Sequence, residues 1–304
     1  MATRLQSNQY QVSKVSPSLG AEVRGISLAQ AGADVVKEIM DLLHEHLVLF
    51  FPGQHMTTEQ HIEFGRYFGH IEGHPNVKNL TPYPEILELK GSRGGVADEW
   101  HSDLTFQSEP SILSILRVVT CPEVGGDTMW SNMYKAYDEL SAPLRDLCEG
   151  LTALHDAHPH NRADAMAMHP VVRVHPVTRR KSLFVNEHFT RRIVEMSHEE
   201  SELLLSYLRR WVSSPRFTVR YQWSKGTVAI WDNRCTQHFV LDDFDGERIV
   251  QRVTVVGDVP EAASSPRWQP YIHDKGATRR HDRQLRDFLQ SASDAPADNT
   301  VQGM

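Results

Sequence analysis

Cysteine is scarce in this chain of 304 residues, which contains three, at positions 121, 148 and 235. An odd number at irregular spacing argues against a disulfide framework or a cysteine-based zinc cluster, so we expect free thiols in a reducing cytoplasm. Long apolar runs are missing as well, and Leu47–Phe51 is typical of a buried strand, not of a membrane span. The opening residues Met1–Gln6 lack an apolar segment, so we expect no signal peptide.

The chain also lacks an excess of positive charge. Its formal net charge of −7 gives no sign of binding to nucleic acid or to an anionic membrane. The first seventy residues alternate strand and helix but carry no glycine-rich phosphate loop, and the chain has no internal repeat. With 40% hydrophobic residues it can form a sizeable core. We therefore expect a small-molecule partner, and the sequence leaves open a homodimer or homotetramer.

Many short strand patterns with few helices between them indicate the fold class. The pattern predicts an α+β protein with a double-stranded β-helix, a jelly roll of the cupin type, as its core and with flanking helices. A parallel βαβ fold fits less well because the second half has too few helices. Residues 1–260 would form this single domain, and 261–304 a C-terminal extension that is partly disordered, with a basic amphipathic helix near residues 279–289. Residues Thr57–Gln60 and Ser197–Glu200 are capping boxes, and Ser131 and Ser141 resemble helix N-caps.

The candidate centre is Trp100-His101-Ser102-Asp103. Two residues apart on an extended segment, His101 and Asp103 point to the same face and can reach one metal ion. Because the chain has 17 histidines, a His-x-Asp pair alone is weak evidence. A third ligand is available in His238, and two histidines with one carboxylate are the ligand set of non-haem Fe(II) oxygenases. A zinc site in a jelly-roll hydrolase is the alternative from another class.

Two arginines follow the third candidate ligand. Arg248 and Arg252 lie on or beside the apolar pattern Ile249–Val256, and their even spacing places them on one face of a strand. An isolated strand arginine is usually a surface charge. Two on one face beside a metal ligand instead indicate an inward anion site, because a guanidinium matches a carboxylate or sulfonate.

Six motifs in this order resemble the TauD/TfdA family of Fe(II)- and 2-oxoglutarate-dependent dioxygenases, and the resemblance extends from about residue 20 to 260. It implies that Fe(II), 2-oxoglutarate as co-substrate and O2 take part, and that His101, Asp103 and His238 bind the iron. It further implies that Thr128 and Arg248 bind the distal carboxylate of 2-oxoglutarate. The motifs are Trp100–Asp103, Gly125–Trp130, His169–Pro176, Phe184–Glu187, Trp231–His238 and Arg248–Thr254.

The same resemblance implies an anion site for the substrate. His74 matches the residue that helps bind a sulfonate or sulfate, and Leu104 matches the residue whose backbone amide contacts that group. Phe189 would be an apolar wall, and Arg252 would face either the substrate or the co-substrate. An Asn and a Tyr of taurine-specific members are replaced here by Ala97 and Val77, which puts taurine in doubt.

The expected reaction is hydroxylation of a small anionic substrate next to a heteroatom, with release of succinate and CO2. The predicted substrate is an alkyl or aryl sulfonate or an alkyl sulfate ester. An aryloxyalkanoate or another carboxylate is the alternative within the family, and a non-catalytic cupin-like binding protein is a further alternative outside it.

Overall fold

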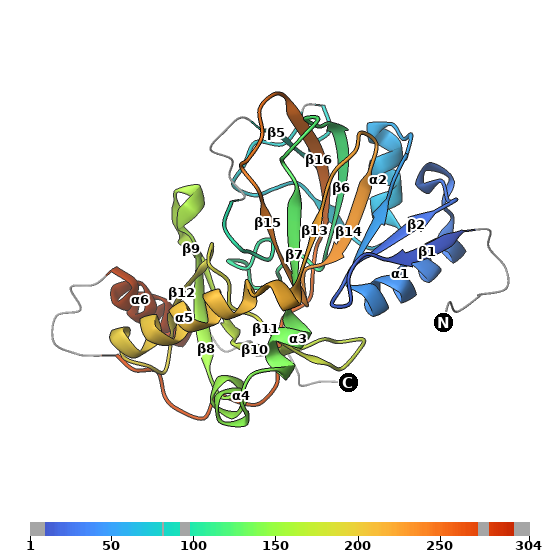
Figure 1. The fold of residues 1–304 in the computed structure, drawn as a ribbon. Helices are drawn as coiled ribbons and strands as arrows, with labels where there is room; N and C mark the ends of the chain where they lie inside the picture. Colours follow the sequence, from blue (N-terminus) through green and yellow to red (C-terminus); the bar gives the residue numbers. More distant parts are fainter. Residues whose placement is uncertain (1–9, 81, 92–97, 273–279, 295–304) are drawn as a thin grey trace, which may run out of the picture.

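The computed structural model describes residues 10–80, 82–91, 98–272 and 280–294. In this part the chain combines helices with several β-sheets (Figure 1). None of the described helices has the length and apolar character needed to cross a lipid bilayer. Residues 92–97, including Ala97, lie outside the described residues.

The largest sheet has eight strands in the order β1-β2-β3-β14-β6-β16-β4, with β5 also paired to β16. Strands β2 and β3 pair in parallel, whereas the central pairs β3–β14, β14–β6 and β6–β16 are antiparallel. The strands are β1 (Gln11–Lys14), β2 (Ala21–Arg24), β3 (Val48–Phe51), β4 (Ile71–Glu72), β5 (Ile86–Gly91), β6 (Leu113–Thr120), β14 (Val228–Asp232) and β16 (Arg248–Val255).

A second, three-stranded sheet packs face to face with the middle of the large one. It consists of β13 (Thr218–Tyr221), β7 (Thr128–Asn132) and β15 (Thr236–Val240), in that order. Aromatic rings join the two sheets: the ring centroids of Trp130 and Trp231 lie 5.7 Å apart, and Tyr221 stacks on Phe50 at 3.8 Å. The candidate ligand His238 belongs to this second sheet.

Two N-terminal helices, α1 (Ala33–His46) and α2 (Thr58–Arg66), cover the opposite face of the large sheet (Figure 1). The alternation of side chains along a strand explains how β3 serves both layers. Leu49 and Phe51 join the cluster with the helices, whereas Val48 and Phe50 join the cluster between the sheets. The fully buried strand expected at residues 47–51 is confirmed.

Two small sheets lie beside this sandwich. Helices α3, α4 and α5 pack with them around a separate apolar cluster that includes Leu151, Leu183 and Leu205. One sheet contains β12 (Thr190–Ile193), β8 (Thr152–Ala157) and β9 (Arg162–Pro170), and the other contains β11 (Lys181–Leu183), β10 (Val172–Val174) and β17 (Glu261–Ala262). The helices are α3 (Met133–Asp138), α4 (Ala142–Glu149) and α5 (His198–Val212), with short 3-10 turns η1 (Leu28–Gln30), η2 (His158–His160) and η3 (Pro215–Phe217).

The observed starts of the helices can be compared with the predicted capping residues. Both capping boxes are present at the starts of α2 and α5. The N-cap predicted at Ser131 is wrong, because Ser131 is the fourth residue of β7 and its hydroxyl donates to the carbonyl of Val212. Asn132 caps α3 instead by accepting from the backbone N–H of Lys135. Ser141 does occupy the N-cap of α4, but its side chain makes no capping bond.

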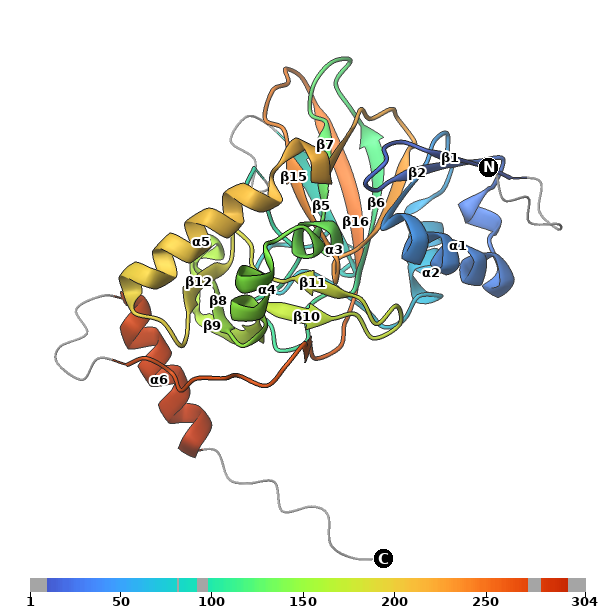
Figure 2. The ribbon, with the colours of Figure 1, turned by 60° about the horizontal axis from the view of Figure 1, so that its bottom comes forward.

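Beyond residue 260 the chain returns to the domain and forms α6 (Arg280–Asp294), which lies near the start of α5 in Figure 2. Leu285 is 1% exposed and packs with Leu154 and Val194. Asp282 forms an ion pair with the buried Arg192. This part of the extension is therefore packed against β8 and β12, while residues 295–304 lie outside the described part of the chain.

Candidate active site

The first two candidate ligands are brought to the third by an isolated antiparallel bridge. His101 and His238 pair across it, with the N–H of each donating to the carbonyl of the other at 3.1 and 2.8 Å. Their ring centroids are 4.0 Å apart, and Nε2 of His101 is 3.9 Å from Oδ1 of Asp103. Potential ligand atoms of all three residues lie within 4.8 Å of one another. The structure thus brings together the triad predicted from residues far apart in sequence.

The protonation states suit a divalent cation. Burial, and then the neighbouring His238, hold the pKa of His101 well below its usual value. Burial lowers the pKa of His238 to about 4, so both imidazoles are neutral at pH 7. Burial alone would raise the pKa of Asp103, but the Arg252 guanidinium, 2.6 Å away, lowers it below its usual range. The set is therefore two neutral nitrogen donors and one carboxylate.

Hydrogen bonds to neighbouring residues hold these three side chains in place and leave atoms free that could bind a metal. Nδ1 of His101 donates to the carbonyl of Glu99 at 2.7 Å, so Nε2 keeps its lone pair for a metal. Asp103 accepts from Ser114 Oγ at 2.7 Å and from Arg252 Nη1 at 2.6 Å, and a carboxylate has lone pairs left for a cation. Nδ1 of His238 is buried without a partner in the described structure. These observations fit a bound metal ion.

Asn233 is a positioning residue for Asp103 that the sequence did not single out. Its Oδ1 accepts from the backbone N–H of Asp103 at 3.2 Å and from Trp231 Nε1 at 3.0 Å. Its Nδ2 donates to Ser111 and Ser114 at 3.1 and 3.0 Å. One amide thus ties the metal-binding turn to the end of β14.

We expect Asn233→Ala to weaken metal binding about 10- to 100-fold, because outer-shell contacts orient a ligand without touching the ion. Calorimetric titration of the metal-free protein with Fe(II) without oxygen, or with Mn(II), measures the affinity. Ser111→Ala is the matched control, since it removes one partner of Asn233 and leaves Asp103 untouched. Equal affinity in Asn233→Ala and wild type would show that the turn holds its shape without this amide.

A second group of two histidines and one carboxylate resembles a metal site in its residue types but differs in its contacts. His44, His175 and Asp232 also bring ligand atoms within 4.8 Å. Here Arg234 donates to both Asp232 oxygens, at 2.9 and 2.7 Å, and Nε2 of His175 donates to the same carboxylate at 3.0 Å. The carboxylate is thus neutralised by a guanidinium in place of a metal, and we assign this group a structural role.

A pocket between the two sheets opens beside His238 and contains the predicted co-substrate residues. Its walls are largely apolar and include Trp130, Trp223 and Trp231, while Thr128 and Arg248 provide polar groups. Thr128 Oγ1 accepts from Trp223 Nε1 at 3.0 Å, which leaves the hydroxyl hydrogen available to a ligand.

Arg248 is the most informative residue of this pocket. Its side chain is 5% exposed, its Nε donates to the carbonyl of Gly126 at 3.2 Å, and its buried Nη2 has no partner in the described structure. Burial lowers the pKa of this guanidinium, and no described carboxylate forms an ion pair with it. A buried cation without an anion is costly, so the pocket fits a ligand that carries one. Gly126 has φ +68°, and a Cβ there would lie 3.2 Å from Arg248 Cδ, so glycine lets the backbone approach closely.

His74 and Leu104, which were predicted to bind the anion, do not line that pocket. In His74, Nδ1 accepts from the backbone N–H groups of Asn76 and Val77 at 3.1 and 3.0 Å, so a neutral ring carries its hydrogen on Nε2. Burial and then Arg252 lower the pKa of His74 to about 3. His74 is thus a neutral N–H donor at pH 7. Arg252 pairs with Asp103 and also borders the co-substrate pocket, so it contacts a metal ligand directly.

Leu104 has a strained backbone directly after the ligand Asp103. Its φ is +58°, in the left-handed region that leucine rarely adopts. The side chain is nevertheless buried, in a cluster with Phe106 and Phe189. The chain therefore tolerates strain at this turn in order to hold both the metal ligand and an apolar wall.

We expect Leu104→Gly to be more stable than Leu104→Ala by about 1 kcal/mol, although glycine removes more apolar surface. The reason is that a Cβ is unfavourable at positive φ. Urea unfolding of the two variants measures the difference. Greater stability of the alanine variant would mean that the turn relaxes when the leucine side chain is removed.

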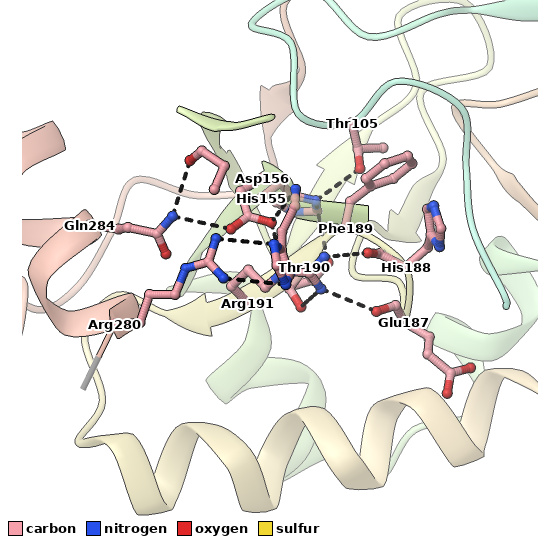
Figure 3. Close-up of polar contacts among 12 residues, drawn as sticks. Thr105, His155, Asp156, Glu187, His188, Phe189, Thr190, Arg191, Arg280 and Gln284 are labelled. Atoms are coloured by element: carbon pink, nitrogen blue, oxygen red, sulfur yellow. Dashed lines mark hydrogen bonds and ion pairs between the residues drawn. The ribbon is translucent and has the colours of Figure 1, made fainter. Parts of the chain in front are cut away.

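A buried hydrogen-bond network supports the segment that carries Phe189 (Figure 3). Thr105 Oγ1 contacts His155 Nδ1 at 3.0 Å and accepts from Asn186 Nδ2 at 3.1 Å. Asn186 Oδ1 accepts from the backbone N–H of Phe189 at 2.8 Å, and Arg191 donates to Asp156 at 2.7 Å just beyond it. Hydrogen bonds therefore join the segment after Asp103 to the segment that carries Phe189.

Two histidines near the site were not predicted from the sequence. His188 has its ring 5.4 Å from that of His101, and its Nδ1 lies 2.7 Å from Glu99 Oε2. His160, at the end of η2, lies 5.0 Å from the His74 ring. His160 has no motif around it, while His188 directly follows the motif Phe184–Glu187, so its place beside Phe189 was the available signal.

Two histidines and one carboxylate that could hold one cation, next to a pocket with a buried unpaired arginine, form the arrangement expected of a mononuclear site of the non-haem oxygenase type. Comparison with known proteins agrees with this class. Residues 11–254 match the model of the "Taurine catabolism dioxygenase TauD, TfdA family". The chain therefore belongs to the TauD/TfdA family and is an oxidoreductase of the dioxygenase type.

Individual relatives show which members of the family this chain is similar to. The chain is 38% identical to an alkylsulfatase of Acinetobacter baylyi, over 86% of this chain and 90% of that protein. It is also 38% identical to an alpha-ketoglutarate-dependent sulfate ester dioxygenase of Pseudomonas putida, over 86% and 94% of the two chains. Among solved structures, a taurine dioxygenase from Burkholderia xenovorans superposes with a TM-score of 0.77 at 37% identity, covering 84% of this chain and 94% of that one.

Proposed function

We propose that this protein is an Fe(II)- and 2-oxoglutarate-dependent dioxygenase that acts on alkyl sulfate esters or on alkyl or aryl sulfonates. Its two facing sheets would form the double-stranded β-helix, or jelly roll, of the catalytic core. The observation that carries the proposal is the buried, unpaired Arg248 in a pocket that the candidate ligand His238 also lines. A dicarboxylate can place one end on Arg248 and Thr128 and present its 2-oxo acid end to the metal.

The metal triad alone would also suit a zinc hydrolase, but Arg248 discriminates between the two. Hydrolysis at zinc needs a bound water and a general base, and it gives no use to an unpaired guanidinium in a neighbouring pocket. A non-catalytic binding protein leaves the complete and correctly protonated triad without a purpose. The names of the relatives from Acinetobacter baylyi and Pseudomonas putida further support the dioxygenase and the sulfate ester.

When bound, Fe(II) with 2-oxoglutarate and O2 supplies the oxidising power to hydroxylate a C–H bond, and it converts 2-oxoglutarate to succinate and CO2. The residues of this chain would position the substrate and the co-substrate and would exclude water from the site. Arg248 and Thr128 would orient the co-substrate, while His74 Nε2–H and the Leu104 backbone amide would hold the anionic head group. Phe106 and Phe189 supply an apolar wall for the organic part.

The bond changes follow from where the hydroxyl group is placed. For an alkyl sulfate, one oxygen atom of O2 enters the C–H bond beside the ester oxygen, and the other enters succinate. The resulting hydroxyalkyl sulfate loses its C–O bond to the sulfate, which yields an aldehyde and inorganic sulfate. For an alkyl sulfonate, the hydroxyl group enters the C–H bond beside sulfur, the carbon–sulfur bond then breaks, and an aldehyde and sulfite are formed.

A substrate panel tests the proposed function. Protein loaded with Fe(II) and 2-oxoglutarate in air is offered alkyl sulfates, alkyl and aryl sulfonates and aryloxyalkanoates. We expect sulfate esters or sulfonates to increase succinate formation at least about tenfold over the substrate-free rate, which corresponds to about 1.4 kcal/mol in the barrier. Stimulation by aryloxyalkanoates alone, with phenol released, would contradict the sulfur oxyanion and favour the carboxylate alternative.

A further inference from the structure

His160 occupies the centre of a ring cluster on the substrate side of the metal triad. Its ring centroid lies 5.0 Å from that of His74, 5.5 Å from Phe189, 5.7 Å from Phe106 and 5.7 Å from His188. It thus touches both the candidate anion donor His74 and the apolar wall. The 3-10 turn η2 delivers it there between β8 and β9, and Asn161 ends this turn with φ +58°.

The imidazoles of this cluster are not equivalent as hydrogen-bond donors. His74 carries its hydrogen on Nε2, because two backbone N–H groups occupy its Nδ1. In His188, Nδ1 lies 2.7 Å from the Glu99 carboxylate, so the N–H at this nitrogen is already used within the protein. His74, in contrast, keeps its Nε2–H for a ligand.

His160 is the imidazole whose hydrogen-bonding capacity is not used. Its Nδ1 is buried and has no partner within the described parts of the chain. Buried polar atoms in proteins are usually satisfied, so an unused ring nitrogen beside a candidate anion donor indicates a missing ligand. Burial also lowers the pKa of His160 to about 4. The charge of Arg252 lowers this pKa further, and the charge of Asp103 raises it. The ring is therefore neutral at pH 7 and can donate through one N–H.

We propose that His160 donates this N–H to a non-bridging oxygen of the substrate's sulfate or sulfonate group. The inference rests on the proposed function and adds a substrate-binding residue to it. A sulfur oxyanion of this kind presents three oxygens in a tetrahedral arrangement, and His74, the Leu104 amide and His160 would offer N–H donors to it in addition to Arg252. A carboxylate presents only two oxygens in one plane, so several donors would have to share each oxygen with poorer hydrogen-bond geometry. His160 would thus favour the sulfur oxyanion over a carboxylate head group.

Binding under anaerobic conditions tests this role without turnover. Hexyl sulfate and hexanoate are titrated by calorimetry into protein loaded with Fe(II) and 2-oxoglutarate. His160→Phe keeps an aromatic ring but removes the N–H, and His160→Gln keeps a donor. The exposed His158 lies on the same turn outside the ring cluster, so His158→Gln is the matched control.

We expect His160→Phe to raise the Kd for hexyl sulfate about 10- to 100-fold, the range for a hydrogen bond to a charged group. His160→Gln should recover most of that loss, and His158→Gln should match the wild type. Hexanoate should bind weakly to wild type and to His160→Phe alike, and the affinity for 2-oxoglutarate should be unchanged.

Each other result has a defined meaning. Equal hexyl sulfate affinity in wild type and His160→Phe would overturn the role of His160 and leave the proposed function intact. Loss of 2-oxoglutarate binding in His160→Phe would mean that the ring is structural, which also overturns it. If the wild type binds no sulfate ester and no sulfonate, the proposed substrate class fails and the role of His160 fails with it.

Discussion

Replacing Arg248 by methionine is expected to weaken 2-oxoglutarate binding by about 2–5 kcal/mol, which is about thirty- to several-thousandfold, while the metal still binds. The guanidinium is buried, and no described carboxylate pairs with it, so the distal carboxylate of 2-oxoglutarate would be its anion. Methionine has a similar length but no charge. Calorimetry with 2-oxoglutarate on the Mn(II)-loaded protein measures the loss.

The same substitution has a second expected effect that a merely damaged protein would not show. Without 2-oxoglutarate the wild type bears the cost of an unpaired buried cation, so Arg248→Met should be at least as stable as wild type. Its Tm should no longer rise when 2-oxoglutarate is added. The control is Arg220→Gln, because Arg220 is half-exposed on strand β13 of the second sheet and pairs with Asp127. Loss of metal binding with unchanged 2-oxoglutarate affinity would contradict the assignment of Arg248.

Replacing Asp103 by alanine should reduce turnover by at least about a thousandfold, because the metal loses its anionic ligand. It should also destabilise the metal-free protein by about 3–5 kcal/mol, since Arg252 is then left buried without a counter-ion. Arg252 Nη1 lies 2.6 Å from Asp103 Oδ1, and both side chains are nearly inaccessible. Metal titration and urea unfolding measure the two effects separately.

A second substitution separates these two roles of Asp103. In Asp103→Ala/Arg252→Met the unpaired cation is gone, so most of the lost stability should return while metal binding stays weak. Asp164→Ala is the surface control, because Asp164 is exposed and pairs with Arg162 on β9. Wild-type metal affinity in Asp103→Ala would show that the carboxylate is not a ligand.

The sequence could predict the triad because its ligands carry local signals. The spacing of His101 and Asp103 predicted that both reach one point, although Asp103 begins the turn that follows the bridge at His101; His238 follows the apolar strand that ends at Asp232. The two arginines of β16 were likewise predicted to face inward, and both are buried. Alternation and spacing are properties of single segments, and they persist when the chain folds.

Other features of the site depend on which segments meet, and no single segment contains that information. The contact of Arg252 with Asp103 joins residues 149 positions apart, and that of Asn233 with Asp103 joins residues 130 apart. His160 reaches the site only because η2 turns the chain between β8 and β9. Without an alignment, a histidine with no motif around it cannot be distinguished from the others in this chain.

Helix capping illustrates the same limit on a smaller scale. Ser131 has the right residue type for an N-cap, but strand pairing with β13 and β15 extends β7 through Asn132. The cap therefore moves one residue along the chain. Tertiary hydrogen bonds decide such boundaries, and residue preference gives only their approximate position.

The stoichiometry of turnover with hexyl sulfate distinguishes the proposed dioxygenase from a hydrolase. Succinate, inorganic sulfate and the aldehyde are measured together in air with Fe(II) and 2-oxoglutarate. We expect the three products in equal amounts, and no products when Fe(II), 2-oxoglutarate or O2 is omitted. Release of sulfate with an alcohol in place of an aldehyde, independent of 2-oxoglutarate and O2, would contradict the proposed dioxygenase and identify a hydrolase.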